Sequence, residues 1–556
     1  MSDRSRPAAL PVSLVSLLAT AVVCAPLFGG YLLHRDAVAT PRSPLTAAAF
    51  GIDGAPPRAV PQDGALAIAS QGIDGGFLVA ALIALTLFGA GLGYGRLAAR
   101  LLPAAGTGGA VAAALVAIWN PFVAERLLQG QWSLLTGYAA LGWMVCAVLD
   151  LREDPGWTRW AVLAGLLAAA GFTPTGSLLG LVVAAVALAA TDLARRPAYW
   201  AGLLGVWVLT ALPWLVAAAY SDDAGGPVDG AEAFAARAEP LLGTAGSLLG
   251  LGGIWNADAV PTSRTSGWAA VATLALLAVV VVGGAALWRQ RRRLPRPVLA
   301  LGVLAAVVLA VIACAATGPG LAAVDWLLTH VPGAGLLRDT QKYLALALPF
   351  YALAAAAAVG WLRAWVPTGF AVAAVAALIV APLPDLAWGV GGALKPVEYP
   401  DDYARAVALI GADDRAVLLI PASGMRDFPW NNAPSLSPLP RMLDAPVIVD
   451  DTLLVDGVAL DGPAAEQPLD PAALHDVGWV VWEAPRADRV DLPPPARLEF
   501  SGDHLAVYRL PDAPAHPAPG AAAWMTAAIA HALWFGCLLG LFAPLARRGQ
   551  RARAGR

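Results

Sequence analysis

About a dozen long apolar stretches, joined mostly by short polar connections, run through this chain of 556 residues. A helix needs roughly 20 predominantly apolar residues to cross a bilayer. Stretches of this kind lie near 10–32, 75–97, 106–124, 133–151, 158–174, 176–194, 199–220, 267–288, 297–317, 342–363, 368–388 and 521–545. The pair 158–174 and 176–194, divided at Thr173-Pro174-Thr175-Gly176, is compatible with two spans or with one long broken helix.

The composition agrees with a membrane protein. Only 13% of the residues are charged, about half the fraction of a soluble domain, while 58% are hydrophobic and the mean hydropathy is +0.65. We therefore expect an all-α polytopic membrane bundle of about 12 transmembrane helices. All four cysteines fall inside the predicted spans, so neither a disulfide nor a metal framework is expected.

Arginine occurs in every second connection, and this sets the expected orientation. With both termini cytoplasmic, the cytoplasmic segments hold 19 of the 36 Lys and Arg residues. Short loops obey the positive-inside rule, whereas large domains are translocated regardless of charge. We expect a plasma-membrane protein with a bundle at 1–388, a long first outer loop at 33–74, an extracytoplasmic domain at 389–520, and a final helix with a basic cytoplasmic tail at 521–556.

Residues 389–520 break the membrane pattern. A helical stretch at 401–411 is followed by short apolar runs at 416–421, 446–451, 478–483 and 504–509, which alternate with proline-rich turns. Runs of this length between turn signals are typical of strands. The segment is therefore predicted to form a small extracytoplasmic α/β domain.

Three outer segments place charged side chains at the ends of predicted spans, where an ionisable group is costly unless it is paired or functional. The first segment contains His34-Arg35-Asp36, directly after the first span. The carboxylate of Asp36 is placed to act as a general base toward a sugar hydroxyl. The alternative is an ion pair with Arg35 or Arg42 that only caps the span.

The second segment runs from Trp119 to Trp132 and contains Asn-Pro followed by a polar cluster made of Glu125, Arg126, Gln129 and Gln131. Glu125 and Gln129 are four residues apart, so they share one helical face. Tryptophan at both ends suits the membrane interface. This segment is either a substrate site or an interfacial half-helix that satisfies its own polar groups.

The third segment, Arg338-Asp339-Thr340-Gln341-Lys342, enters the span at 342–363. Asp339 is a candidate N-cap for that helix. Arg338 and Lys342, four residues apart, would then present two cations at a helix N-terminus, which is suited to binding a phosphate. Snorkelling anchors are the alternative.

This layout resembles the GT-C superfamily of membrane glycosyltransferases, which use polyprenyl-phosphate sugars. Asn-Pro-Phe-Val-Ala-Glu-Arg-Leu-Leu-Gln-Gly-Gln-Trp at 120–132 and Leu-Arg-Asp-Thr-Gln-Lys at 337–342 are similar to segments of actinobacterial envelope membrane proteins. The resemblance implies Asp36 as catalytic base and Glu125 as a second catalytic acidic residue. It also implies a set of substrate-binding residues: Arg35, Arg126, Gln129, Arg338, Asp339 and Lys342. Within this set, Arg126, Arg338 and Lys342 are the implied phosphate ligands. The sequence departs from the superfamily in one respect, because many members have an adjacent acidic pair in the first loop where this chain has Asp36 alone.

The implied reaction is the transfer of a sugar from a polyprenyl-phosphate donor to an envelope glycan or glycolipid, with inversion at the anomeric carbon. Phosphate leaves without an acid, so one base and cationic stabilisation suffice. A divalent cation near Asp36 is compatible with this reaction but not required, and no nucleic-acid partner is expected. The alternatives are a non-catalytic envelope scaffold descended from a transferase and a transporter of a lipid-linked precursor.

Overall fold

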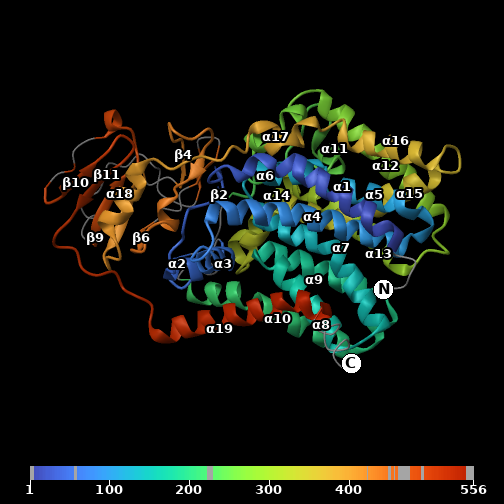
Figure 1. The fold of residues 1–556 in the computed structure, drawn as a ribbon, viewed down its shortest axis with the longest axis horizontal. Helices are drawn as coiled ribbons and strands as arrows, with labels where there is room; N and C mark the ends of the chain where they lie inside the picture. Colours follow the sequence, from blue (N-terminus) through green and yellow to red (C-terminus); the bar gives the residue numbers. More distant parts are fainter. Residues whose placement is uncertain are drawn as a thin grey trace, which may run out of the picture.

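The protein consists of a helical bundle with a small sheet domain at one end (Figure 1). The computed structural model describes residues 6–55, 59–221, 230–421, 424–448, 453–455, 458–460, 476–489, 492 and 494–545. The predicted basic tail, residues 546–556, lies outside the described residues. The main helices of the bundle are α1 (Arg6–Cys24), α4 (Gly75–Leu101), α5 (Gly106–Ile118), α6 (Pro121–Leu128), α7 (Trp132–Glu153), α8 (Trp157–Ala170), α9 (Pro174–Ala189), α10 (Pro197–Tyr220), α12 (Trp268–Arg289), α13 (Arg296–Ala315), α14 (Gly318–His330), α15 (Leu348–Leu362), α16 (Thr368–Val380) and α19 (Ala521–Leu538).

In the described part of the chain, nine helical segments are long and apolar enough to cross a membrane. A tenth is added if 368–380 and 384–392, which are bent by 76° at their break, form one span. The expected count of about 12 is therefore not confirmed. The difference comes mainly from α8 and α9, which are apolar but only 14 and 16 residues long.

The chain forms two separate helices at α8 and α9, not one broken helix. α8 ends at Ala170, and the Thr173 hydroxyl accepts a hydrogen bond of 3.0 Å from Gly176 N at the start of α9. Pro174 occupies the first helical position, where its missing N–H costs nothing. Threonine followed by proline is therefore a helix start at this point.

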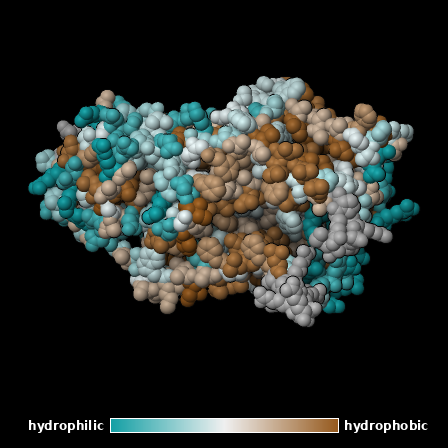
Figure 2. All heavy atoms as spheres, in the orientation of Figure 1, coloured by the Kyte–Doolittle hydropathy of each residue, from teal (hydrophilic) through white to brown (hydrophobic). Residues whose placement is uncertain are grey.

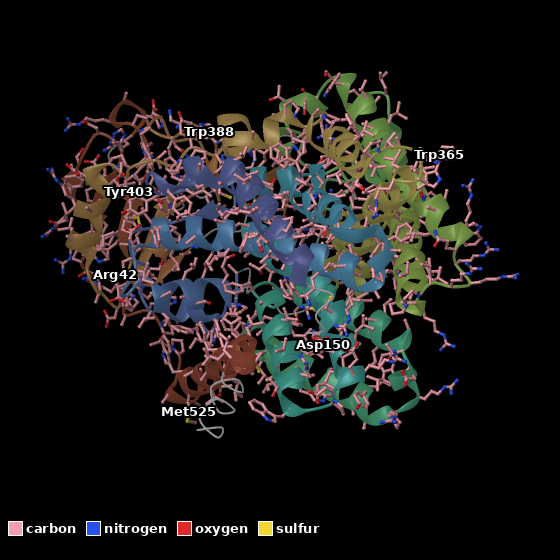
Figure 3. The ribbon with its side chains drawn as sticks, turned by 45° about the vertical axis from the view of Figure 1, so that its right-hand side comes forward. Arg42, Asp150, Trp365, Trp388, Tyr403 and Met525 are labelled. Atoms are coloured by element: carbon pink, nitrogen blue, oxygen red, sulfur yellow. The ribbon has the colours of Figure 1, made fainter. Side chains whose placement is uncertain are left out.

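On the face seen in Figure 2, hydrophobic residues cover most of the bundle, whereas hydrophilic residues gather over the sheet domain and again at the opposite end. Figure 3 shows Tyr403 in the sheet domain and Trp365 far from it, beyond the end of α15. α1 begins and α19 ends at the end of the bundle away from the sheet domain (Figure 1). This distribution is that of a multi-pass membrane protein.

The centre of the bundle is formed by α7 and by the segment Pro103–Leu128, which contains α5 and α6. In their most apolar stretches 89% and 94% of the residues are buried, against 22% in α13. Small residues allow the helices to approach closely. A Cβ atom on Gly283 of α12 would lie 1.8 Å from the carbonyl oxygen of Ala354 in α15, so only glycine fits there. The bundle core is therefore built from backbone proximity as well as from large side chains.

The sheet domain has five strands in the order β10-β11-β9-β3-β6. β3 (Ala416–Ile420) is parallel to β6 (Val447–Ile448) and β9 (Val477–Trp482), while β11 (Ala506–Arg509) is antiparallel to β9 and β10 (Arg497–Ser501). α18 (Asp401–Ile410) packs its apolar face on this sheet. The predicted helix and the four predicted strands coincide with α18, β3, β6, β9 and β11.

The first long loop ties the bundle to the sheet domain. Tyr31 and Val397 exchange two backbone hydrogen bonds of 2.9 Å. β1 (Leu33–His34) and β2 (Ala37–Val38) form a tight antiparallel pair, and Arg35 between them exchanges backbone bonds with Pro434 and Leu436. Further along the loop, α2 (Ala47–Phe50) and α3 (Gln62–Ala69) contact α19. These contacts on both sides of Asp36 fix the position of its loop.

Candidate functional site

The site is organised around α6, a short helix inside the bundle. Asn120 caps it, because the Asn120 side-chain oxygen accepts a hydrogen bond of 3.1 Å from Val123 N, and Pro121 opens the first turn. Glu125 and Arg126, on the next turn, have no exposed surface. Buried charges are tolerated only when they are paired and hydrogen-bonded, so their partners define the site.

Arg126 makes a two-pronged ion pair with Asp339, a residue 213 positions away. Its two terminal nitrogens lie 2.7 Å and 3.3 Å from the Asp339 carboxylate oxygens. The guanidinium also donates to the side-chain oxygens of Gln131, at 2.7 Å, and of Gln341. Bidentate geometry with extra hydrogen bonds makes this pair strong and fixes both partners.

Glu125 is held by two donors. Gly253 N donates to one carboxylate oxygen at 3.0 Å, and the Gln341 amide donates to the other at 2.9 Å. Since the Gln341 side-chain oxygen accepts from Arg126, Gln341 connects the two charges of α6. Glu125 therefore anchors the turn at 252–253 beneath the site.

A second buried ion pair supports that turn. The Arg264 guanidinium donates to both carboxylate oxygens of Glu239, at 2.6 Å for the Nε bond, and to the Thr273 hydroxyl at 3.2 Å. A Cβ atom on Gly252 would lie 2.7 Å from a Glu239 oxygen, so the carboxylate packs directly on the turn. Burial raises the pKa of Glu239, against the lowering effect of Arg264.

Asp36 lies at the edge of this network and is half-buried. Gln131 Nε2 donates to Asp36 Oδ2 at 3.1 Å, and the Asp36 backbone N–H donates to the Gln129 carbonyl at 3.2 Å. Among the described residues, neither Arg35 nor Arg42 lies within ion-pair distance of Asp36. The carboxylate is thus oriented by an amide and not neutralised by a cation.

Lys342 is a partly exposed cation whose charge interacts with that of Asp36. Its side chain is 26% exposed, and its amine lies 3.9 Å from Asp339 Oδ2. The charges of Asp36, Arg126 and Arg338 all act on it. Burial alone would raise the pKa of the Asp339 carboxyl, but the positive charges of Arg126 and Lys342 hold it below its usual range.

The expected helix start at Asp339 differs from the structure in two ways. Asp339 precedes the helix, but its side chain makes no capping hydrogen bond, because it pairs with Arg126. Residues Thr340–Ala347 form a 3-10 helix, in which residues four apart do not share a face. Arg338 instead places its guanidinium 4.2 Å from the ring centre of Phe234. The predicted pair of cations on one helical face is therefore wrong.

Arg35 has a left-handed backbone with φ of 49° and is 8% exposed. One terminal nitrogen donates to the Asp258 carbonyl at 2.9 Å, while the other is buried without a hydrogen-bond partner among the described residues. Gln129 accepts a hydrogen bond of 2.8 Å from Asn256. Both residues therefore join the first loop and α6 to the segment at 256–258.

The structure brings most of the predicted residues into one connected network. Asp36, Glu125, Arg126, Asp339 and Lys342 are joined through Gln131 and Gln341, with Gln129 and Arg35 beside them and Arg338 at the margin. The sequence-based set lacked Gln341 and the Glu239–Arg264 pair. Gln341 stands in the same polar run as Asp339, but nothing local links Glu239 to Arg264.

In the described part of the chain, no group of three or more His, Cys, Asp or Glu side chains gathers as a metal site.

No protein-family model and no curated protein sequence matches the chain. Among solved structures, the fold is similar to a single-particle cryo-EM structure of the arabinofuranosyltransferase AftD from mycobacteria. The TM-score is 0.51 with 17% sequence identity, and the match covers 91% of this chain but 41% of AftD. At this identity the likeness shows a shared fold only, and the chain spans less than half the length of the protein that it matches.

Proposed function

We propose that the chain is a membrane glycosyltransferase of the GT-C type, which transfers a sugar from a polyprenyl-phosphate donor to a glycan or glycolipid acceptor of an actinobacterial cell envelope. The observation that carries this proposal is the half-buried Asp36 carboxylate, which Gln131 orients and whose charge interacts with that of the partly exposed Lys342 side chain. The shared fold with an arabinofuranosyltransferase supports it. The plasma membrane is the proposed location, with the sheet domain and Asp36 on the outer face.

In this proposal Asp36 accepts the proton of an acceptor hydroxyl, whose oxygen attacks the anomeric carbon of the donor sugar. The bond between that carbon and the phosphate oxygen breaks, and polyprenyl phosphate leaves with both electrons of the bond. Lys342 and Arg338 are the proposed phosphate contacts, because cationic donors stabilise the charge that develops on the leaving group. A divalent cation beside Asp36 remains compatible with the reaction.

The buried members of the network take a different role. The resemblance to the GT-C superfamily implied catalysis for Glu125 and phosphate binding for Arg126, but neither has exposed surface and each is bonded to protein groups. We propose that Glu125, Arg126 and Asp339 position Asp36 and Lys342 through Gln131 and Gln341. Gln129 holds the backbone of Asp36 in the same arrangement.

The test is the Asp36→Asn variant, assayed in lipid nanodiscs with polyprenyl-phosphate arabinofuranose and a synthetic arabinan acceptor. Loss of a general base lowers a rate by about 10²–10⁴-fold. We expect a loss in this range with unchanged thermal unfolding, whereas the matched control Asp53→Asn, at an exposed position of the same loop, keeps full activity. Undiminished transfer by Asp36→Asn refutes Asp36 as the base.

A non-catalytic scaffold is the second candidate. It is favoured by the pairing of Arg126 with Asp339 and of Glu125 with Gln341 and Gly253, as expected for a purely structural network. A scaffold tolerates Asp36→Asn in cells, whereas a transferase loses its envelope product. A transporter has less support, because the long apolar spans carry few charges outside this network.

A further inference from the structure

A cavity of about 220 Å³ lies where the bundle meets the sheet domain, outside the network around Asp36. Its lining residues are Phe28, Gly30, Tyr31, Asp74, Phe77 and Glu398. They come from the end of the first helix, the start of α4 and the first residues of the sheet domain. We propose that this cavity binds one sugar unit of the acceptor glycan, at a distance from the reacting unit. The inference rests on the proposed transferase function.

The walls of the cavity are aromatic. The rings of Phe28 and Phe77 have centres 5.9 Å apart and are tilted by 59°. Phe28 and Phe77 are 48% and 57% exposed, so the protein itself leaves much of each residue uncovered. Pockets that combine aromatic walls with a few fixed polar groups are typical binding sites for small ligands.

The polar groups of the cavity are held in place. Asp74 caps α4 by accepting from Phe77 N at 3.0 Å, and its other oxygen accepts from the Tyr31 hydroxyl at 3.0 Å. Gly30, with φ of 137°, would place a Cβ atom 2.8 Å from the Val397 carbonyl and 3.3 Å from a Glu398 oxygen. The position of Glu398 beside Tyr31 is therefore set by a backbone contact that only glycine allows.

The chemistry of the cavity fits a neutral polyhydroxylated ring. In the described part of the chain, neither Asp74 nor Glu398 has a cation within ion-pair distance. Ionised carboxylates are acceptors only, so they suit the hydroxyl donors of a sugar, whose C–H face packs on Phe28 and Phe77. Two negative charges repel a lipid phosphate, and their desolvation disfavours a lipid chain.

The distance to Asp36 suits a single bound chain. Tyr31 precedes Asp36 by five residues, so their Cα atoms are at most ~17 Å apart. An oligosaccharide that reaches from the cavity to Asp36 therefore needs only a few sugar units. Binding energy gained at such a remote unit is available to hold the reacting hydroxyl in position.

The experiment measures binding and transfer separately for the full chain in nanodiscs. The probes are α-linked arabinofuranose oligosaccharides of two to six units, studied by saturation-transfer difference NMR and as acceptors. Phe77→Ala and Glu398→Gln are each expected to weaken binding of the hexasaccharide by about tenfold and to raise its KM to a similar extent. The controls are Phe370→Ala, which removes a 72% exposed ring of α16, and Glu499→Gln, at an exposed position of β10. Both controls leave binding unchanged.

Failure of this inference is distinguishable from failure of the proposed function. If Asp36→Asn abolishes transfer while Phe77→Ala and Glu398→Gln leave hexasaccharide binding and KM unchanged, the cavity is not an acceptor subsite. If Asp36→Asn is fully active but the cavity variants still lose binding, the sugar site stands and the assigned base is wrong. Absence of binding by the unmodified protein in the millimolar range, or displacement of the probe by ethanolamine lipids alone, overturns the sugar site.

Discussion

Gln131 donates a hydrogen bond of 3.1 Å to Asp36 and accepts one of 2.7 Å from Arg126. This amide is therefore the link between the buried Arg126–Asp339 ion pair and the half-buried carboxylate of the candidate site. Since no cation among the described residues lies within ion-pair distance of Asp36, its carboxylate depends on such a donor for its orientation. The orientation of the Asp36 carboxylate therefore depends, through Gln131, on the buried contacts of Arg126.

The first prediction concerns this link. In Gln131→Ala the Asp36 carboxylate loses its side-chain donor, so misplacement is expected to lower kcat by about 10²-fold while KM for the donor lipid stays the same. The control Gln71→Ala removes an exposed amide of the first loop that bonds only to backbone oxygens. Steady-state transfer assays check both variants. An equal rise of KM with constant kcat would instead mean that Gln131 binds the donor.

The second prediction concerns the ion pair itself. Arg126→Met leaves the Asp339 carboxylate buried without its main partner, and loss of one partner of a buried pair costs about 3–5 kcal/mol. We expect a large fall in the thermal unfolding temperature, partly recovered in Arg126→Met with Asp339→Asn. The exposed pair Arg152–Asp192, with side chains 55% and 64% exposed, is the control. Arg152→Met is expected to change stability by at most about 1 kcal/mol.

The third prediction concerns Gly130, which lies beneath the Asp36 loop with φ of 81°. A Cβ atom there would lie 2.3 Å from Ala37 N and 2.5 Å from the His34 carbonyl. Gly130→Ala is therefore expected to displace the loop and abolish transfer, with a stability loss of at least about 1 kcal/mol from the backbone conformation alone. Gly29→Ala is the control, because nothing lies within 4 Å of its Cβ position. Normal activity of Gly130→Ala contradicts the role given to this contact.

Much of the fold could be predicted from the sequence, because apolar helices and strands are encoded in local sequence patterns. Hydropathy alone located the apolar segments, and short apolar runs between proline-rich turns located β3 and β9. β10 was missed because its residues, Arg497–Ser501, mix charged and apolar side chains at the edge of the sheet. The predicted count of about 12 spans is not confirmed, mainly because apolarity does not reveal that α8 and α9 are only 14 and 16 residues long.

The site could be predicted only in part, because its contacts are long-range. The motif around Glu125 and Arg126 was visible, but nothing in the sequence shows that Asp339 neutralises Arg126 from 213 residues away. The helix entering at Thr340 was expected to be an α-helix, so the positions of Arg338 and Lys342 were misjudged. In each case, contacts between residues far apart in the sequence determined the structure, and local helix propensity did not.

The last prediction concerns pH. His34 is 5% exposed in the Asp36 loop, and burial, with the nearby charge of Arg35, lowers its pKa to about 4. The unfolded chain has the ordinary value near 6.5 and so binds more protons than the folded chain between these two values. Stability therefore rises with pH across this window and is lost as pH falls from about 6.5 toward 4.

Between about pH 7.5 and pH 5.0 the His34 contribution amounts to a loss of about 2 kcal/mol. His34→Gln removes the titrating ring, so its unfolding free energy should fall less over this range than that of the unmodified protein. His330→Gln, at an exposed position of α14, is the matched control, because it removes a histidine outside the Asp36 loop. Chemical unfolding in nanodiscs at the two pH values measures the difference. Parallel curves for His34→Gln and the unmodified protein would mean that the loop opens and hydrates His34 before the protein unfolds.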